Sequence, residues 1–255
     1  MDYDYIKCGD CLELMQQLPS KSVDISFTSP PYNDIGTENT TIDTIGSGNT
    51  TQINTHRKYI HVERRKDWFE WLCDCIDEML RVSKKYVLLN IQGIKNNRAD
   101  LYKIIGRYSD IIHDILIWYK PNGCPTGTPH KLSNKYEMVL ILKCDGVDGV
   151  SVNSNYYTNV IVQNVNDDKS FIKEHKAVMS KQFCDEIIKE FTVRGDIVLD
   201  PFFGVGTTGV SCKKHGRHYI GFDIEQRYCN IAEERIANGY WEEKTESKKI
   251  QEKLF

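Results

Sequence analysis

The sequence predicts an α/β fold, a doubly wound and mostly parallel sheet with helices on both faces. Apolar strand-like runs alternate with segments of helical period along most of the 255 residues, which is typical of a sheet covered by helices. A glycine-rich turn, "DPFFGVGTTG" (200–209), follows one such run and precedes a helical segment. Residues 224–255 are too few to complete a sheet of this kind, so earlier strands must supply the rest. The strand order is therefore expected to be permuted.

The elements follow from their local patterns. A strand over 5–7 leads into a helix over 10–18. The strand over 23–27 alternates Val23, Ile25 and Phe27 and stops at two prolines, which cannot continue a central ladder. Apolar residues at helical spacing predict a helix over 67–82: Trp68, Phe69, Leu72, Ile76, Met79 and Leu80. The remaining expected strands are 85–91, 113–119, 136–143, 156–165, 196–200 and 219–224, and the remaining helices are 97–107, 180–191, one from 207, and 226–238.

Two long connections interrupt this alternation. Residues 33–66 are rich in Thr, Asn and Gly, and residues 120–136 are rich in Pro and Gly. Loops of this length within a compact domain are usually functional or disordered. Both belong to what we expect to be one domain, 1–255.

Composition is that of an ordinary globular chain, with 40% hydrophobic and 27% charged residues. No apolar run resembles a signal peptide or is long enough to span a membrane. The nine cysteines are then expected to be reduced thiols in a cytoplasmic protein. The net charge of −3 does not indicate a nucleic-acid partner, but "HRKYIHVERRKDW" (56–68) carries five Arg or Lys against two acids.

The stretch "TSPPYN" (28–33) predicts a rigid polar corner. Pro30 and Pro31 fix two φ angles near −65°. Ser29 and Tyr32 are therefore presented at defined positions directly after a strand.

The glycine turn predicts a ligand site. Gly204 and Gly206 let the backbone approach a ligand, and the helix beyond them offers free amides. Together with Gly209 they spell G-x-G-x-x-G, and Asp223 follows at the end of the next strand, where it can accept hydrogen bonds from ribose hydroxyls. This fingerprint is weak by itself. A nicotinamide dinucleotide site and a tight turn without a ligand remain alternatives.

The pairing of "TSPPY" upstream with "LDPFFGVGTT" downstream resembles the amino-group DNA methyltransferases of the β subgroup. These enzymes methylate cytosine N4 or adenine N6 with S-adenosylmethionine, on a methyltransferase sheet of permuted order. The resemblance covers about residues 5–237, with Lys176 where the family usually has proline. It implies these cofactor-binding residues: Asp10, Cys11, His175, Asp200, Pro201, Phe202, Gly204, Gly206, Thr207 and Asp223.

The resemblance also gives the polar corner a chemical role. An exocyclic base amine is a poor nucleophile, because its lone pair is delocalised into the ring. The Ser29 hydroxyl and the Pro30 carbonyl can accept its N–H groups, and Tyr32 can stack on a base flipped out of the duplex. The implied catalytic residues are Ser29, Pro30, Pro31 and Tyr32.

Serine at position 29 resembles the cytosine-N4 members of the family more than the adenine-N6 members. The sequence contains no Pro-Cys pair, which a cytosine-C5 enzyme would use. An adenine-N6 enzyme and a catalytically silent DNA-binding module remain the alternatives.

Double-stranded DNA is the partner that the resemblance implies, and a cognate restriction endonuclease acting on the same site is a further expected partner. The protein itself is expected to be a monomer or a homodimer. Residues 33–66 are then expected to close over the DNA, and residues 120–172 to recognise the target. The expected phosphate contacts are Arg57, Lys58, Arg64, Arg65, Lys66 and Lys120.

Other possible sites carry less weight. Cys8 and Cys11 form a C-x-x-C without a second pair, and Cys212, His215 and His218 are expected at a helix end and turn. No metal site is expected. Trp68 and Trp71 are expected in the core, whereas Trp118 and Tyr119 could belong to the core or to the base pocket.

Overall fold

A computed structural model describes residues 2–31, 67–93, 97–122, 134–164 and 178–239. Several predicted site residues lie outside these ranges: Tyr32, Arg57, Lys58, Arg64, Arg65, Lys66 and His175. The expected DNA-closing segment, 33–66, lies outside them too.

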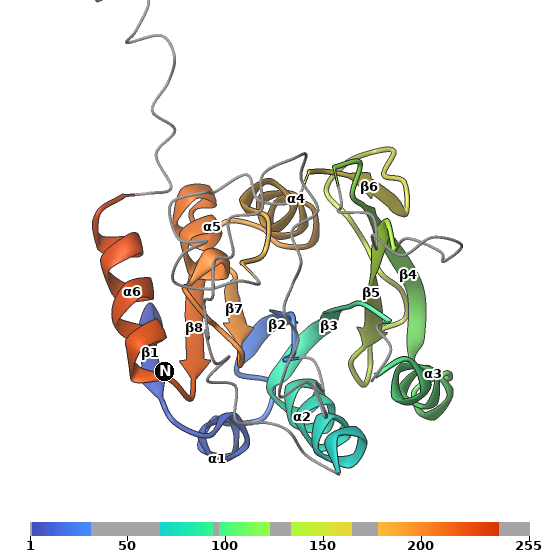
Figure 1. Cartoon of the computed structure of the whole chain (residues 1–255), viewed down its shortest axis with the longest axis horizontal. Helices are drawn as coiled ribbons and strands as arrows, with labels where there is room; N and C mark the ends of the chain where they lie inside the picture. The colour runs from blue at the N-terminus through green and yellow to red at the C-terminus, as the bar shows by residue number, and fades with distance from the viewer. Residues whose placement is uncertain (1, 32–66, 94–96, 123–133, 165–177, 240–255) are drawn as a thin grey trace, which may run out of the picture.

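The described strands form one eight-stranded sheet with the order β1-β8-β7-β2-β3-β5-β4-β6 (Figure 1). Seven strands run in one direction, and β5 is antiparallel to both of its neighbours. The strands are β1 (Tyr5–Cys8), β2 (Val23–Thr28), β3 (Ser83–Ile91), β4 (Ile112–Tyr119), β5 (Tyr136–Lys143), β6 (Val160–Val162), β7 (Ile197–Asp200) and β8 (His218–Asp223).

Six described helices cover the two faces of the sheet. They are α1 (Cys11–Gln16), α2 (Trp68–Val82), α3 (Arg98–Arg107), α4 (Lys181–Phe191), α5 (Thr207–His215) and α6 (Gln226–Ala237). Buried side chains of α1, α2 and α3 form one core cluster, and those of α4, α5 and α6 form the other. Alternate residues of β3 divide between them, with Val87 and Leu89 in the first and Tyr86 and Leu88 in the second. The predicted doubly wound, mostly parallel fold is confirmed.

The permuted order is confirmed where β2 meets β7. These strands are parallel neighbours, with Ile25 opposite Val198 and Ser26 opposite Leu199. Their carboxyl ends therefore meet at one edge of the sheet, which we call the carboxyl edge. This pairing brings Ser29 close to Asp200, although the two residues are far apart in the sequence.

Two elements are shorter than expected. The first helix begins at Cys11 because Asp10 caps it, its Oδ1 accepting the Leu12 and Glu13 N–H groups at 2.9 and 3.2 Å. Of the expected strand over 156–165, only Val160–Val162 (β6) form a strand, and among the described strands it pairs only with β4. Within the described part of the chain, no helix has the length and apolar character needed to cross a membrane.

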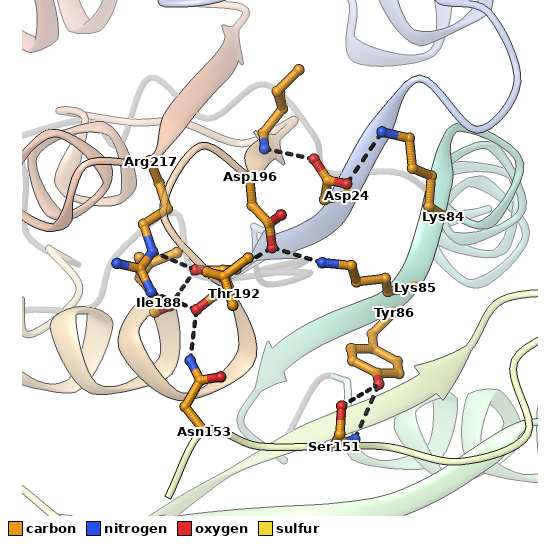
Figure 2. Close-up of polar contacts among 12 residues, drawn as sticks. Asp24, Lys84, Lys85, Tyr86, Ser151, Asn153, Ile188, Thr192, Asp196 and Arg217 are labelled. Atoms are coloured by element: carbon orange, nitrogen blue, oxygen red, sulfur yellow. Dashed lines mark hydrogen bonds and ion pairs between the residues drawn. The ribbon is translucent and has the colours of Figure 1, made fainter.

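Polar contacts link neighbouring strands at the opposite end of the sheet, where these strands begin, which we call the amino edge (Figure 2). Asp196, just before β7, accepts hydrogen bonds from Lys85 Nζ at 2.7 Å and from the Val193 N–H at 3.0 Å. Asp24 of β2 accepts the Ile197 N–H at 2.8 Å and pairs with Lys84. These contacts tie β2, β3 and β7 together at the end of the sheet away from Ser29.

Candidate functional site

The candidate site lies at the carboxyl edge, where β1, β8, β7, β2 and β3 end. Gly9 donates its N–H to the Asp223 carbonyl at 2.9 Å, which joins the turn after β1 to the end of β8. Asp200 ends β7 and the Ser29 corner follows β2. The sheet thus brings together most of the described residues that the resemblance implied, at the edge where parallel α/β sheets bind ligands.

Asp200 connects the polar corner to the glycine turn. Its Oδ1 accepts the Thr28 hydroxyl at 2.5 Å and the Phe202 N–H at 3.1 Å, and its Oδ2 accepts the Thr208 hydroxyl at 2.6 Å. The residue is 3% exposed. Burial raises the pKa of this carboxyl to about 6, against the opposing effect of the two hydroxyl donors. In this structure the Asp200 carboxylate accepts these hydrogen bonds from groups of the protein itself.

The glycine turn packs closely against α6. Gly206 has φ +79°, and a Cβ there would lie 2.7 Å from the Ala232 Cβ of α6, so both conformation and space require glycine. Arg235, fully buried in α6, donates to the Val205 carbonyl at 2.5 Å and lies 3.4 Å from the Thr207 hydroxyl. The turn is therefore fixed by α6 before any ligand arrives.

Asp223 faces the same turn. Its Oδ2 accepts the Gly204 N–H at 2.8 Å and its Oδ1 accepts the Glu225 N–H at 2.9 Å. Burial raises the pKa of this carboxyl, while the two N–H donors act in the other direction. Each carboxylate oxygen has a second lone pair, so Asp223 can still accept hydroxyl donors from a ligand.

Two tryptophans of α2 support the site from the core. Trp68 and Trp71 are 1% and 3% exposed, which confirms the prediction that they are core residues. Trp68 Nε1 also donates to the Pro31 carbonyl at 3.0 Å, and the Trp71 ring lies 5.5 Å from the Phe202 ring. One helix therefore contacts both the polar corner and the "DPF" segment.

Sequence reasoning missed the polar neighbours of Ser29. Asn90 Nδ2 donates to Ser29 Oγ at 3.4 Å and to Glu137 Oε2 at 2.7 Å, and Lys120 Nζ donates to Glu137 Oε1 at 2.7 Å. Asn90 within the apolar run 86–91 was the available signal, because a polar residue in a buried strand needs a partner.

The expected phosphate contact of Lys120 is corrected by this arrangement. Lys120 is 6% exposed, and its ammonium is bound by Glu137. Such a side chain faces the interior and does not present its charge to a DNA backbone.

The other predicted residues divide between the site and the core. Cys11 is buried, with its sulfur 3.8 Å from that of Cys75. Trp118 is a core residue stacked on Phe183 at 4.3 Å, whereas Tyr119 is 41% exposed. Over the described ranges, no group of three or more His, Cys, Asp or Glu side chains could hold a metal ion.

Solved structures show the class to which this fold belongs. The chain is similar to a PvuII DNA methyltransferase described as cytosine-N4-specific, with a TM-score of 0.68 and 16% identity over 94% of this chain and 95% of that one. It is also similar to an M1.HpyAVI complex with S-adenosylmethionine, with a TM-score of 0.63 and 20% identity over 91% and 98% of the two chains. The fold is that of S-adenosylmethionine-dependent methyltransferases.

The family model described as DNA methylase, of the N6/N4 type, matches residues 23–234. The chain belongs to this family of DNA methylases, whose methyl donor is S-adenosylmethionine. Among its relatives is the type II methyltransferase M.HinfI of Haemophilus influenzae, 27% identical over 89% of this chain and 67% of the relative. M.HpaI of Haemophilus parainfluenzae is 24% identical over 90% and 73%.

The buried Asp200 predicts a specific pH dependence of stability. Its pKa rises from 3.8 to about 6 on folding, so between these values the folded state binds more protons than the unfolded state. Its contribution to the free energy of unfolding is then full below pH 3.8 and falls as pH rises through 6, by about 3 kcal/mol. In Asp200→Asn the amide can accept from Thr28 and donate to Thr208.

Denaturant unfolding of both proteins from pH 4 to 7 measures this effect. The stability of Asp200→Asn relative to the native protein is expected to increase with pH, since other carboxyls cancel in the difference. Parallel pH profiles would contradict the assignment.

Proposed function

We propose that the protein transfers a methyl group from S-adenosylmethionine to the exocyclic N4 amine of a cytosine flipped out of double-stranded DNA. The observation that carries the proposal is the Thr28–Asp200 hydrogen bond of 2.5 Å. It joins the polar corner, which would hold the base, to the "DPF" segment and the glycine turn, which would hold the cofactor.

The cofactor side of the site fits S-adenosylmethionine. Asp223 has acceptor capacity for ribose hydroxyls, and the start of α5 offers backbone amides. Half-buried Phe202 supplies apolar surface beside it. The proposed contacts are Asp10, Cys11, Asp200, Pro201, Phe202, Gly204, Gly206, Thr207 and Asp223, with His175 outside the described residues. When bound, the cofactor supplies an electrophilic sulfonium methyl group.

The base side would act by positioning. Ser29 Oγ and the Pro30 carbonyl would each accept one N–H of the target amine, which orients the nitrogen lone pair toward the methyl carbon. In such a transfer the N–C bond would form as the C–S bond of the bound cofactor breaks, and the amine would then lose one proton to solvent. Tyr32 would stack on the flipped base and so offset part of the unstacking cost, about 1–3 kcal/mol.

Cytosine is favoured over adenine by Ser29. The similar PvuII enzyme is described as cytosine-N4-specific, and the serine of "TSPPY" resembles the cytosine-N4 members of the family. Adenine N6 is the second candidate, because its amine also lies beside a ring nitrogen acceptor. We place the activity in the cytoplasm, in a restriction-modification pair with an endonuclease that cuts the unmethylated site.

Product analysis tests the proposal directly. Purified protein, unmethylated DNA and labelled S-adenosylmethionine are incubated, and the DNA is digested to nucleosides and analysed by mass. N4-methyldeoxycytidine is the expected product. N6-methyldeoxyadenosine would overturn the choice of base, and S-adenosylmethionine binding without transfer to any DNA would favour the silent DNA-binding module. Protection of the protein by NAD but not by S-adenosylmethionine would favour the dinucleotide alternative.

Ser29→Ala tests the base-holding role. The variant is expected to lower kcat by about 10²-fold, as the loss of one preorganised transition-state hydrogen bond does in other enzymes. The dissociation constant for S-adenosylmethionine should not change. Ser26→Ala is the matched control, because Ser26 lies in β2, the strand that Ser29 follows, and its hydroxyl contacts the Ser83 hydroxyl at 2.8 Å. Equal kcat for Ser29→Ala and Ser26→Ala would remove Ser29 from the mechanism.

We also propose that 33–66 closes over DNA and that 120–172 recognises the target, within one domain over 1–255. Replacing 36–62 with a short Gly-Ser linker should weaken DNA binding at least tenfold at low salt and leave cofactor affinity unchanged. Neutralising Arg57, Lys58, Arg64, Arg65 and Lys66 should reduce the salt dependence of DNA binding. A deletion variant with native DNA affinity would refute the closing role.

A further inference from the structure

We propose that Asn90, Glu137 and Lys120 form a buried polar chain that orients the Ser29 hydroxyl toward the target base. The inference rests on the proposed role of Ser29 and assigns positioning residues to it. None of the three lies in the "TSPPY" or "DPFFGVG" motifs that define the site in the sequence.

The polar chain of Ser29 and these three residues runs along the carboxyl edge of the sheet. Each residue lies in or directly after one of four neighbouring strands. Ser29 follows β2, Asn90 is near the end of β3, Glu137 is near the start of β5 and Lys120 follows β4. Three contacts of 3.4, 2.7 and 2.7 Å join them in that order. The antiparallel direction of β5 is what places the start of that strand, and hence Glu137, at this edge.

Burial makes the orientation of the Asn90 amide obligatory. Asn90 is 1% exposed and Glu137 is 9% exposed, so neither can exchange its partner for bulk water. An ionised Glu137 only accepts hydrogen bonds, so it requires the NH₂ end of Asn90 and the ammonium of Lys120. The same Asn90 nitrogen then lies toward Ser29.

An unpartnered atom shows that Glu137 decides this orientation. Asn90 Oδ1 is buried and has no hydrogen-bond partner among the described residues. Leaving a buried acceptor unpaired is unfavourable, so the amide is not oriented by its oxygen. The charge-assisted contact with Glu137 outweighs that cost, because bonds to ionised groups are about twice as strong as neutral ones.

The Asn90 contact fixes which hydrogen bonds the Ser29 hydroxyl can still make. Asn90 Nδ2 donates into one lone pair of Ser29 Oγ, so the serine proton cannot be directed at Asn90. The hydroxyl is left with one O–H to donate and one lone pair to accept. Cytosine presents a matching edge, with the N4 amine as donor beside N3 as acceptor.

The buried ion pair requires paired substitutions for its test. Removing only Lys120 or only Glu137 leaves an uncompensated buried charge, which can prevent folding. In Lys120→Met/Glu137→Met the charges disappear together and Asn90 loses its acceptor. In Lys120→Met/Glu137→Gln the charges also disappear, but the side-chain oxygen of the introduced glutamine can still accept from Asn90.

Crystal structures of the native protein and both double variants give the first measurement. Asn90 is expected to keep its nitrogen toward Ser29 in the Gln variant and to rotate away in the Met variant. An Asn90 that stays on Ser29 in the Met variant would overturn the proposal. This readout does not depend on methyl transfer, so it decides the inference even if the native protein proves inactive and the proposed function fails.

Steady-state kinetics on unmethylated DNA give the second measurement. The Met double variant and Asn90→Ala are each expected to lower kcat at least tenfold, with the cofactor dissociation constant unchanged. The Gln double variant should stay within threefold of the native kcat. Lys85→Met, which removes the partner of Asp196 at the amino edge, controls for general loss of stability and should retain the native kcat.

Two kinetic results would count against the positioning role. One is a native kcat in both Asn90→Ala and the Met double variant. The other is equal losses in the Met and Gln variants, which would attribute the effect to charge and not to the orientation of Asn90. Should the Met variant fail to fold, Asn90→Ala still provides the decisive comparison.

Discussion

The contacts of the Asp200 carboxylate are the constraint on which the site depends. Asp200 is 3% exposed, and its carboxylate joins the end of β2, through Thr28, to the start of α5, through Thr208. Two short sequence motifs that are far apart in the chain thereby become one rigid assembly. Burial raises the pKa of the carboxyl to about 6, so ionisation at neutral pH costs stability. This loss of stability occurs at the candidate functional site, where chemistry requires a defined geometry of the side chains.

The two edges of the sheet use polar residues differently. At the amino edge, Asp196 and Asp24 accept backbone N–H groups and pair with partly exposed lysines, which fixes strand ends. At the carboxyl edge, Glu137 and Lys120 are nearly enclosed and lead through Asn90 to Ser29. Buried ion pairs contribute little net stability. The carboxyl-edge pair is better explained by the orientation that it imposes on its neighbours.

The order and type of the elements could be predicted from the sequence because strand and helix periods differ along this chain. Val23, Ile25 and Phe27 alternate as a strand does, and the apolar residues of 68–80 recur at helical spacing. Helix and strand limits were less accurate, as at Asp10, whose side chain caps the helix that it was expected to begin. Local pattern does not record which group a cap satisfies.

The sequence by itself determined the class of sheet, its permuted order and the two motifs that meet at the site. Prolines and glycines specify backbone geometry locally, so their meaning survives without tertiary information. Only the tertiary structure decided that Lys120 turns inward to Glu137 and that Asn90 reaches Ser29. Those contacts join strands that are distant along the chain, and whether a lysine meets solvent or a buried carboxylate depends on strand pairing, which residue type alone does not specify.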